Sequence, residues 1–369
     1  MDRREGRCLI NGKFLSRRAT GTERYARELL VAADALLPAS ADWTLLCPPG
    51  VRPPAFARIR VREVGRPGWP SHAWEQLVLP AAARGGRLLN LAGSSPWIGA
   101  ARSATTIHDA AVFDRPEAYT RPFVAWYRRS FRHLVASGTR LITVSAFSRD
   151  RLCEALGTPA SRWAIVPDGG DHLLRVDADP TAIDRLGLRG RRTLLAVASA
   201  NPAKNLARLL EAWARLPPAE DLRLVLVGGR NDAVFAAPGT SEAPGPAPGV
   251  VHAGTVDDAT LKALYGHARA LVFPSLYEGF GLPPLEAMTL GCPVIAARAA
   301  SLPEVCGDAA LYVDPMSVDA IADAMRRILA DEALADRLAS AGRARAGALT
   351  WDAAARALLE TLDGRDGGG

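Results

Sequence analysis

The chain has 369 residues, enough for two domains that each bury a hydrophobic core, and its 49% apolar and 23% charged residues are typical of a soluble globular protein. No uncharged apolar run approaches the about 20 residues of a membrane span, and the first residues, MDRREGRCLING, lack the apolar core of a signal peptide. The net charge of +6 is uneven: residues 1–172 carry 25 Lys and Arg against 15 Asp and Glu, a net of +10, and the remainder carries 20 against 24, a net of −4.

Short apolar runs alternate with helical stretches along the chain, which predicts parallel sheets with crossover helices. After a first strand near the N-terminus, the strands expected in the first half are Trp43–Cys47, Leu88–Leu91, Thr105–His108, Leu141–Ser145 and Ala164–Pro167. Those expected in the second half are Leu194–Ser199, Leu222–Gly228, Val250–Gly254, Ala270–Phe273, Pro293–Ala297 and Ala310–Val313. The polar segment 177–192 is expected to link a domain of residues 1–176 to one of residues 193–350.

Two features of the first half lie where open α/β sheets bind ligands. Thr20 and Glu23 have the spacing of a capping box, and Gly21 between them would let a ligand approach the start of a helix. His108, followed by Asp109, ends an expected strand, and ligands bind at the carboxyl ends of parallel strands. Taken alone, an ordinary helix cap and a hydrogen-bonded structural histidine are the simpler explanations of these residues.

Lys204 in the second half follows a strand and precedes the helix that starts at Leu206. An ammonium group at a helix start is well placed to bind a diphosphate. Taken alone, Lys204 is more simply explained as an ordinary solvated charge at a helix start.

The segment ALVFPSLYEGFGLPPLEAMTLGCPVIAA, residues 270–297, reads as strand, loop, helix and strand. Glycines in its loop allow a ligand to approach the backbone. Two prolines open its helix without losing a hydrogen bond, and the start of that helix presents unpaired N–H groups and partial positive charge. Glu278 and Glu286, eight residues apart, flank that helix start. The combination suggests a ligand with phosphate and hydroxyl groups, such as a nucleotide sugar, and a helix cap with one exposed carboxylate is the equally simple alternative.

The residues YEGFGLPPLEAMTLGCPVIAA resemble the signature of retaining glycosyltransferases of family 4. The stretch TTIHDAAVFDRPEAY resembles the His-Asp segment of that family, and WEQL with Pro80 resembles polysaccharide-assembly transferases, including bacterial mannosyltransferases. The resemblance implies the GT-B fold, an α/β architecture of two doubly wound Rossmann-like domains facing a central cleft. It further implies an acceptor side in the first domain, a donor side in the second, and a last helix, 351–363, that packs back on the first domain.

The resemblance also implies roles for individual residues. His108 would contact the transferred sugar, Lys204 the donor phosphates, Glu278 the donor sugar and Glu286 the ribose hydroxyls. Ser199 stands where the family usually has arginine, which leaves the usual two-cation clamp in doubt, with Arg230 as a candidate substitute. Other donor-binding positions implied by the resemblance are Gly21, Ser199, Asn205, Val256, Gly279, Phe280, Gly281 and Leu282.

The implied reaction is transfer of a hexose, with retention, from GDP-mannose or a UDP-sugar to a glycan or polyprenyl-diphosphate-linked acceptor in cell-surface polysaccharide or glycolipid assembly. An epimerase of the same fold and a non-catalytic sugar-nucleotide-binding protein are the alternatives. No metal-binding spacing of Cys and His is present, so we expect neither metal nor cofactor. Five scattered cysteines indicate reduced thiols and a cytoplasmic protein. The basic first half favours an anionic membrane surface over nucleic acid, for which no binding motif occurs.

Overall fold

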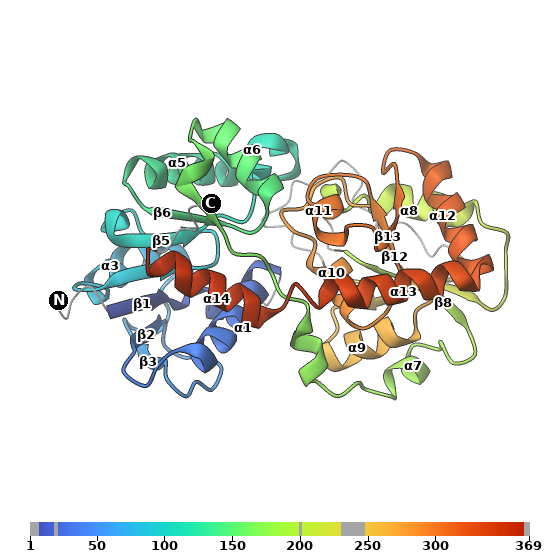
Figure 1. Cartoon of the computed structure of the whole chain (residues 1–369), viewed down its shortest axis with the longest axis horizontal. Coiled ribbons are helices and arrows are strands. Elements are labelled where there is room, and N and C mark those ends of the chain that lie inside the picture. Colours follow the sequence, from blue (N-terminus) through green and yellow to red (C-terminus); the bar gives the residue numbers. More distant parts are fainter. Residues whose placement is uncertain (1–6, 18–20, 199–200, 230–247, 365–369) are drawn as a thin grey trace. The chain divides into compact units, whose positions relative to one another are not determined.

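A computed structural model of the chain describes residues 7–17, 21–198, 201–229 and 248–364. The chain forms two compact units (Figure 1). The first comprises Met1–Phe113, Val124–Asp168 and Trp351–Gly369, and the second comprises Asp114–Phe123 and Gly169–Thr350. Thr20, Ser199, Arg230 and Arg18 lie outside the described residues.

The first unit contains a seven-stranded parallel sheet of order β3-β2-β1-β4-β5-β6-β7. Strand order runs outward in both directions from β1 and β4, which is the switch point where doubly wound sheets bind ligands. The inner strands are apolar because helices on a parallel sheet bury both of its faces. The strands are β1 (Arg7–Asn11), β2 (Asp42–Cys47), β3 (Arg60–Glu63), β4 (Arg87–Asn90), β5 (Ser103–Thr106), β6 (Arg140–Thr143) and β7 (Trp163–Ile165).

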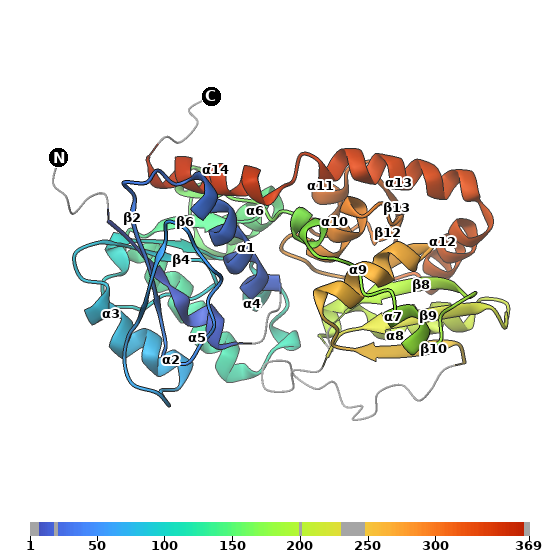
Figure 2. The same cartoon turned by 90° about the horizontal axis from the view of Figure 1, so that it is seen from below.

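Helix α14 (Trp351–Leu362) belongs to the first unit, where it lies along α1 (Gly21–Leu36), as Figure 2 shows. Trp351 is fully buried and meets the ring of Tyr25 edge to face, with centroids 6.1 Å apart. Burial of one tryptophan contributes several kcal/mol, about 3–5, so this contact fixes the end of the chain to the first sheet. Further helices here are α2 (Ser71–Ala73), α3 (Leu79–Ala82), α4 (Ala111–Asp114), α5 (Arg121–Ala136) and α6 (Ala146–Leu156), with α4 and α5 crossing unit boundaries.

The second unit contains a six-stranded parallel sheet of order β10-β9-β8-β11-β12-β13. Its switch point lies between β8 and β11, the strands that precede Lys204 and Glu278. Its strands are β8 (Arg192–Val197), β9 (Leu222–Val227), β10 (Val250–Gly254), β11 (Ala270–Phe273), β12 (Val294–Ala297) and β13 (Ala310–Val313).

Three helices of the second unit start at polar caps that satisfy one of their first N–H groups. Asp257, Ser317 and Asp331 each accept a hydrogen bond from the backbone N–H three residues on. A core of leucines with Trp213 and Met325 packs on the sheet and includes residues of three helices. The helices are α7 (Ala182–Arg185), α8 (Leu206–Ala214), α9 (Asp258–His267), α10 (Leu282–Thr289), α11 (Leu302–Cys306), α12 (Val318–Ala330) and α13 (Glu332–Ala346).

The strands expected from the sequence are confirmed, most of them shifted or shortened by one or two residues. The expected strand Thr105–His108 ends at Thr106, so His108 lies in the loop beyond it. Strand β3 was not predicted because all four of its residues are exposed and carry no apolar pattern. The polar segment 177–192 contains α7 and is tied to α9 by a hydrogen bond from Asp179 N to Ala259 O, 3.0 Å long.

Within the described residues, no helix is long and apolar enough to cross a membrane. All five cysteines are free thiols, and four of them are buried.

Candidate active site

Loops after β8 and β11 bring the two predicted catalytic groups of the second unit together. Lys204 ends the 3-10 turn Pro202–Lys204, which Asn201 caps by accepting a hydrogen bond from Ala203 N. The Lys204 Nζ lies 2.7 Å from Oε1 and 2.9 Å from Oε2 of Glu278. The two side chains are 20% and 13% exposed, so a ligand can reach both. In this structure the Glu278 carboxylate therefore makes the contacts with the Lys204 ammonium group that a donor phosphate would make.

Asn205 holds this part of the sheet edge together. Its backbone is left-handed, with φ of 60°, and its side chain is buried. The Nδ2 group donates to Pro274 O at 3.0 Å and to Pro315 O at 2.7 Å, which joins the loops after β8, β11 and β13. Because both amide hydrogens are used within the protein, the geometry gives the Asn205 side chain a role in positioning Lys204.

The glycine loop before α10 is shaped by Gly281 and Ser301. Gly281 has φ of 116°, and a Cβ there would lie 2.7 Å from Leu302 Cδ2, so only glycine fits. The buried Ser301 hydroxyl lies 2.6 Å from Phe280 O and 3.0 Å from Glu278 O, and so it fixes both ends of the loop. Phe280 and Leu282 point into the core, both 7% exposed, so only their backbone can meet a ligand.

Glu286 lies on α10 and is almost enclosed, with its side chain 4% exposed. The Tyr265 hydroxyl donates to Oε2 at 2.9 Å, and His172 Nε2 lies 3.0 Å from Oε1. The backbone just before His172 packs closely against α10, because a Cβ on Gly170 would lie only 2.4 Å from Thr289 Oγ1. A carboxylate has about four lone-pair positions, so its chemistry suits accepting hydrogen bonds from ribose hydroxyls as well as from the protein.

Val256, the position expected to meet the nucleotide base, lies in the turn between β10 and α9. Gly254 takes φ of 65° at one end, and Asp257 caps α9 at the other by accepting from Thr260 N at 2.9 Å. The turn is therefore rigid on both sides of the Val256 backbone.

His108, in the first unit, is a neutral histidine whose tautomer follows from its partner. Its Nε2 lies 2.9 Å from Leu91 O, and because a carbonyl only accepts, Nε2 carries the proton and Nδ1 is an acceptor. Burial lowers the pKa of His108 to about 4, against the opposing hydrogen bond to Leu91. The ring meets Tyr25 edge to face at 4.8 Å. Near pH 7 the group can accept a hydrogen bond from a sugar hydroxyl, while carrying no positive charge of its own.

Gly21 is the first residue of α1 and is exposed. A Cβ added at this position would meet no heavy atom within 4 Å. The glycine is therefore not required by packing, and the space around it is open to a ligand.

Sequence reasoning missed a buried charge pair at the switch point of the first sheet. Lys13 Nζ lies 2.6 Å from Glu75 Oε2, and the two side chains are 4% and 0% exposed. Glu75 Oε1 also accepts from Asn11 at 2.9 Å and from Ser94 at 2.7 Å. The only sequence signal was the WEQL stretch containing Glu75, which gives no indication of its partner.

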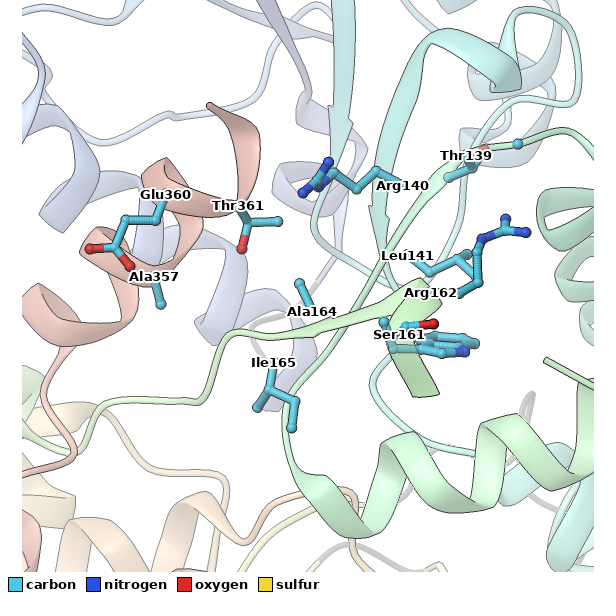
Figure 3. Close-up of a pocket in the computed structure, with 12 residues that line it drawn as sticks. Thr139, Arg140, Leu141, Ser161, Arg162, Ala164, Ile165, Ala357, Glu360 and Thr361 are labelled. Atoms are coloured by element: carbon cyan, nitrogen blue, oxygen red, sulfur yellow. The ribbon is translucent and has the colours of Figure 1, made fainter. Parts of the chain in front are cut away.

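A hollow of about 640 Å³ opens beside β6, β7 and α14 in the first unit (Figure 3). Its lining includes Arg140 and Trp163, the first residues of β6 and β7, so it reaches the amino ends of these strands. Ligands bind at the opposite, carboxyl ends in such sheets. None of the predicted site residues lines this hollow.

The predicted residues thus fall into two groups. The structure brings Lys204, Asn205, Glu278 and the glycine loop into contact, with Glu286 on the helix that follows. His108 and Gly21 belong to the other unit. The residues that position the first group, namely His172, Tyr265 and Ser301, were not predicted. No group of three or more His, Cys, Asp or Glu side chains able to hold a metal occurs in the described ranges.

Two family models match the chain, one on each unit. "Glycosyltransferase Family 4" matches residues 19–172, and "Glycosyl transferases group 1" matches residues 180–345. Among curated proteins, the O-antigen chain mannosyltransferase B of Escherichia coli is 33% identical over 261 residues, which is 68% of this chain and 67% of that protein. An MMP alpha-(1->4)-mannosyltransferase of Mycolicibacterium hassiacum is 33% identical over 61% of this chain and about half (52%) of its own length.

Solved structures agree on the fold. A sucrose-phosphate synthase from Thermosynechococcus elongatus superposes with a TM-score of 0.74 at 22% identity, covering 98% of this chain and 100% of that one. Anabaena HepE in complex with UDP and glucose gives a TM-score of 0.72 at 17% identity over 98% and 100% of the two chains. With two parallel α/β units and both family matches, this chain is a glycosyltransferase of the GT-B fold and belongs to family 4.

Proposed function

We propose that this glycosyltransferase moves a hexose from a nucleotide-diphosphate sugar to a glycan or lipid-linked acceptor, with retention of the anomeric configuration. The observation that carries the proposal is the Lys204–Glu278 pair at the carboxyl edge of the second sheet, 2.7 Å apart. It offers a cation for the leaving diphosphate and a carboxylate for the sugar hydroxyls. The mannosyltransferase names of the relatives favour GDP-mannose as donor over a UDP-sugar, and O-antigen assembly as the model for the acceptor.

The mechanism we propose relies on the chain's own groups. The diphosphate displaces Glu278 from Lys204, and the ammonium group meets the negative charge that grows as the glycosidic bond breaks. Backbone N–H groups of Gly279, Phe280 and Gly281, with the start of α10 at Leu282, add partial positive charge. In this proposal Glu278 orients the transferred sugar, and His108 accepts a hydrogen bond from that sugar through Nδ1. Glu286 binds the ribose hydroxyls, and the backbone of the Val256 turn contacts the base.

Nucleotide release from a panel of nucleotide sugars, measured with and without lipid-linked glycan acceptor, tests the proposal. We expect GDP-mannose to be turned over only with acceptor, and to the same extent with EDTA present. Turnover without acceptor would instead indicate an epimerase or hydrolase. Activity abolished by EDTA and restored by magnesium would contradict the proposed metal-free charge stabilisation.

Glu286→Gln is expected to weaken nucleotide binding by about 1–3 kcal/mol, because ribose hydroxyls lose a charged acceptor while the side-chain volume is kept. Calorimetry with GDP measures the change. Tyr265→Phe is the matched control, since it removes the hydroxyl on Oε2 and leaves the carboxylate in place. Unchanged affinity in Glu286→Gln, or an equal loss in Tyr265→Phe, would contradict direct contact with the ribose.

We further propose that the basic first half of the chain attaches to anionic membranes through exposed arginines of α5, Arg121, Arg129 and Arg132. Arg128 is excluded because it donates to Val112 O and Phe113 O within the unit. Each arginine near an anionic surface contributes about 1 kcal/mol, which salt weakens. Replacing all three by Gln should abolish sedimentation with phosphatidylserine vesicles at low salt. Equal sedimentation with phosphatidylcholine vesicles would contradict the electrostatic basis.

A further inference from the structure

His72 of the first unit lies between two cations at the carboxyl ends of β1 and β4. Lys13 lies in the turn that follows β1 and Arg17 directly after it, and His72 lies on the short helix α2. The distance from Lys13 Nζ to His72 Nδ1 is 3.1 Å, and that from Arg17 Nη2 to His72 Nε2 is also 3.1 Å. Both ring nitrogens therefore face groups that can only donate hydrogen bonds.

This arrangement leaves one contact unsatisfied, because a neutral imidazole has one acceptor nitrogen and one N–H group. Protonation would give two N–H groups facing two cations, which is worse. Burial, followed by the charges of Lys13 and Arg17, lowers the pKa of His72 to about 4, and Glu75 opposes this. His72 is accordingly neutral at pH 7, with one N–H directed at a cation.

Charge balance is also incomplete on one side of His72. Lys13 is neutralised by the buried Glu75 at 2.6 Å. Arg17 is exposed, its partners are His72 and the Tyr127 hydroxyl, and it forms no ion pair with a carboxylate of the described chain. An anion bound at Arg17 would balance its charge and allow His72 to become a second cationic donor.

An aromatic wall stands beside this position. Trp126 is 36% exposed and its ring centroid lies 6.1 Å from that of His72. It stacks on Trp97 at 5.4 Å, and Trp97 stacks in turn on His133 at 5.1 Å. Such a stack holds the exposed indole rigidly, and the apolar C–H face of a pyranose packs well on an indole.

We infer that Arg17 and His72 bind the phosphoryl group of a phosphorylated sugar whose ring packs on Trp126, forming the acceptor subsite of this enzyme. The inference rests on the proposed transfer reaction and names the class of acceptor. Lys13 and Glu75 are positioning residues, since they hold the ring of His72 without reaching the ligand. The phosphoryl group belongs either to a free sugar phosphate or to a lipid-linked diphosphate sugar, and both offer the same chemistry to Arg17.

NMR titration of the histidine rings in the full chain tests the inference, with the signal of His72 assigned by its loss in His72→Gln. Saturating mannose 1-phosphate should raise the pKa of His72 by at least about one pH unit, because the bound anion favours the imidazolium form. Methyl α-mannoside, which has no phosphate, should leave it unchanged. The same shift with farnesyl diphosphate but not with inorganic phosphate would indicate a lipid-linked source of the phosphoryl group. The same shift with inorganic phosphate would indicate a free anion.

Variants separate the subsite from a general charge effect. Arg17→Gln should weaken mannose 1-phosphate at least about tenfold and remove the shift of His72. Arg102→Gln, which removes another exposed arginine of the same unit, should do neither. An unshifted His72 in the saturated protein, or equal weakening by Arg102→Gln, would overturn the inference. GDP calorimetry on the same samples reports the donor site separately, so failure of the proposed reaction and failure of this subsite give different results.

Discussion

Lys204→Ala is expected to lower turnover about 10²–10³-fold while weakening donor binding much less. Loss of one charged or polar group that stabilises developing charge costs about 2.7–4 kcal/mol of activation free energy. The charge on the leaving diphosphate grows in the transition state, so Lys204 contributes more there than in the ground state. In the resting enzyme its Nζ lies 2.7 Å from Glu278, so the phosphate replaces an existing partner and the net gain on binding is small.

Steady-state kinetics with calorimetry of GDP separates these two effects. Lys262→Ala is the matched control: it removes a lysine of the same unit whose Nζ donates to Val176 O and not to Glu278. Lys204→Arg keeps the charge but changes its geometry, and it should retain part of the activity. A raised Michaelis constant for donor with unchanged turnover would make Lys204 a binding residue alone. Equal loss in Lys262→Ala would point to a defect in folding.

The strands and the helix starts were predictable because they are encoded locally. Pro283 and Pro284 fix the start of α10, Gly281 fixes the turn before it, and apolar runs mark β11 and β12 on either side. The positions of Glu278 and Glu286 follow from this local pattern. Their neighbours do not, since Ser301 and Tyr265 reach them from other strand connections and have no distinctive sequence around them.

Two predicted side chains make contacts within the protein that the sequence did not indicate. Asn205, expected to touch the donor, uses its amide on two backbone carbonyls of distant loops. His108, expected to contact the transferred sugar, carries a proton on Nε2 that is committed to Leu91. Both outcomes depend on contacts between segments far apart in the chain, and a local pattern cannot specify them.

Glu75→Ala is expected to destabilise the first unit by about 3–5 kcal/mol, because it leaves the ammonium group of Lys13 buried without a counter-charge. The side chains of the pair are 4% and 0% exposed, so water cannot take the place of the carboxylate. Ser94 and Asn11, which also donate to Glu75, lose their acceptor at the same time. Urea unfolding followed by near-UV signal from the tryptophans would measure the loss.

The dependence of this loss on pH identifies its cause. Burial lowers the pKa of Lys13 from 10.5, and attraction to Glu75 opposes the lowering. Between the lowered pKa and 10.5 the unfolded chain binds more protons than the native protein, so stability rises with pH. Without Glu75 the native pKa of Lys13 falls further and the rise begins at lower pH, so the variant should recover part of its deficit as the pH is raised from neutrality towards 10.5. The double variant Lys13→Met, Glu75→Leu should be more stable than Glu75→Ala and should lack this recovery, because neither charge is then buried, while the smaller loss from Ser94 and Asn11 remains. A deficit in Glu75→Ala that does not change with pH would show that lost packing, and not the isolated ammonium, is responsible.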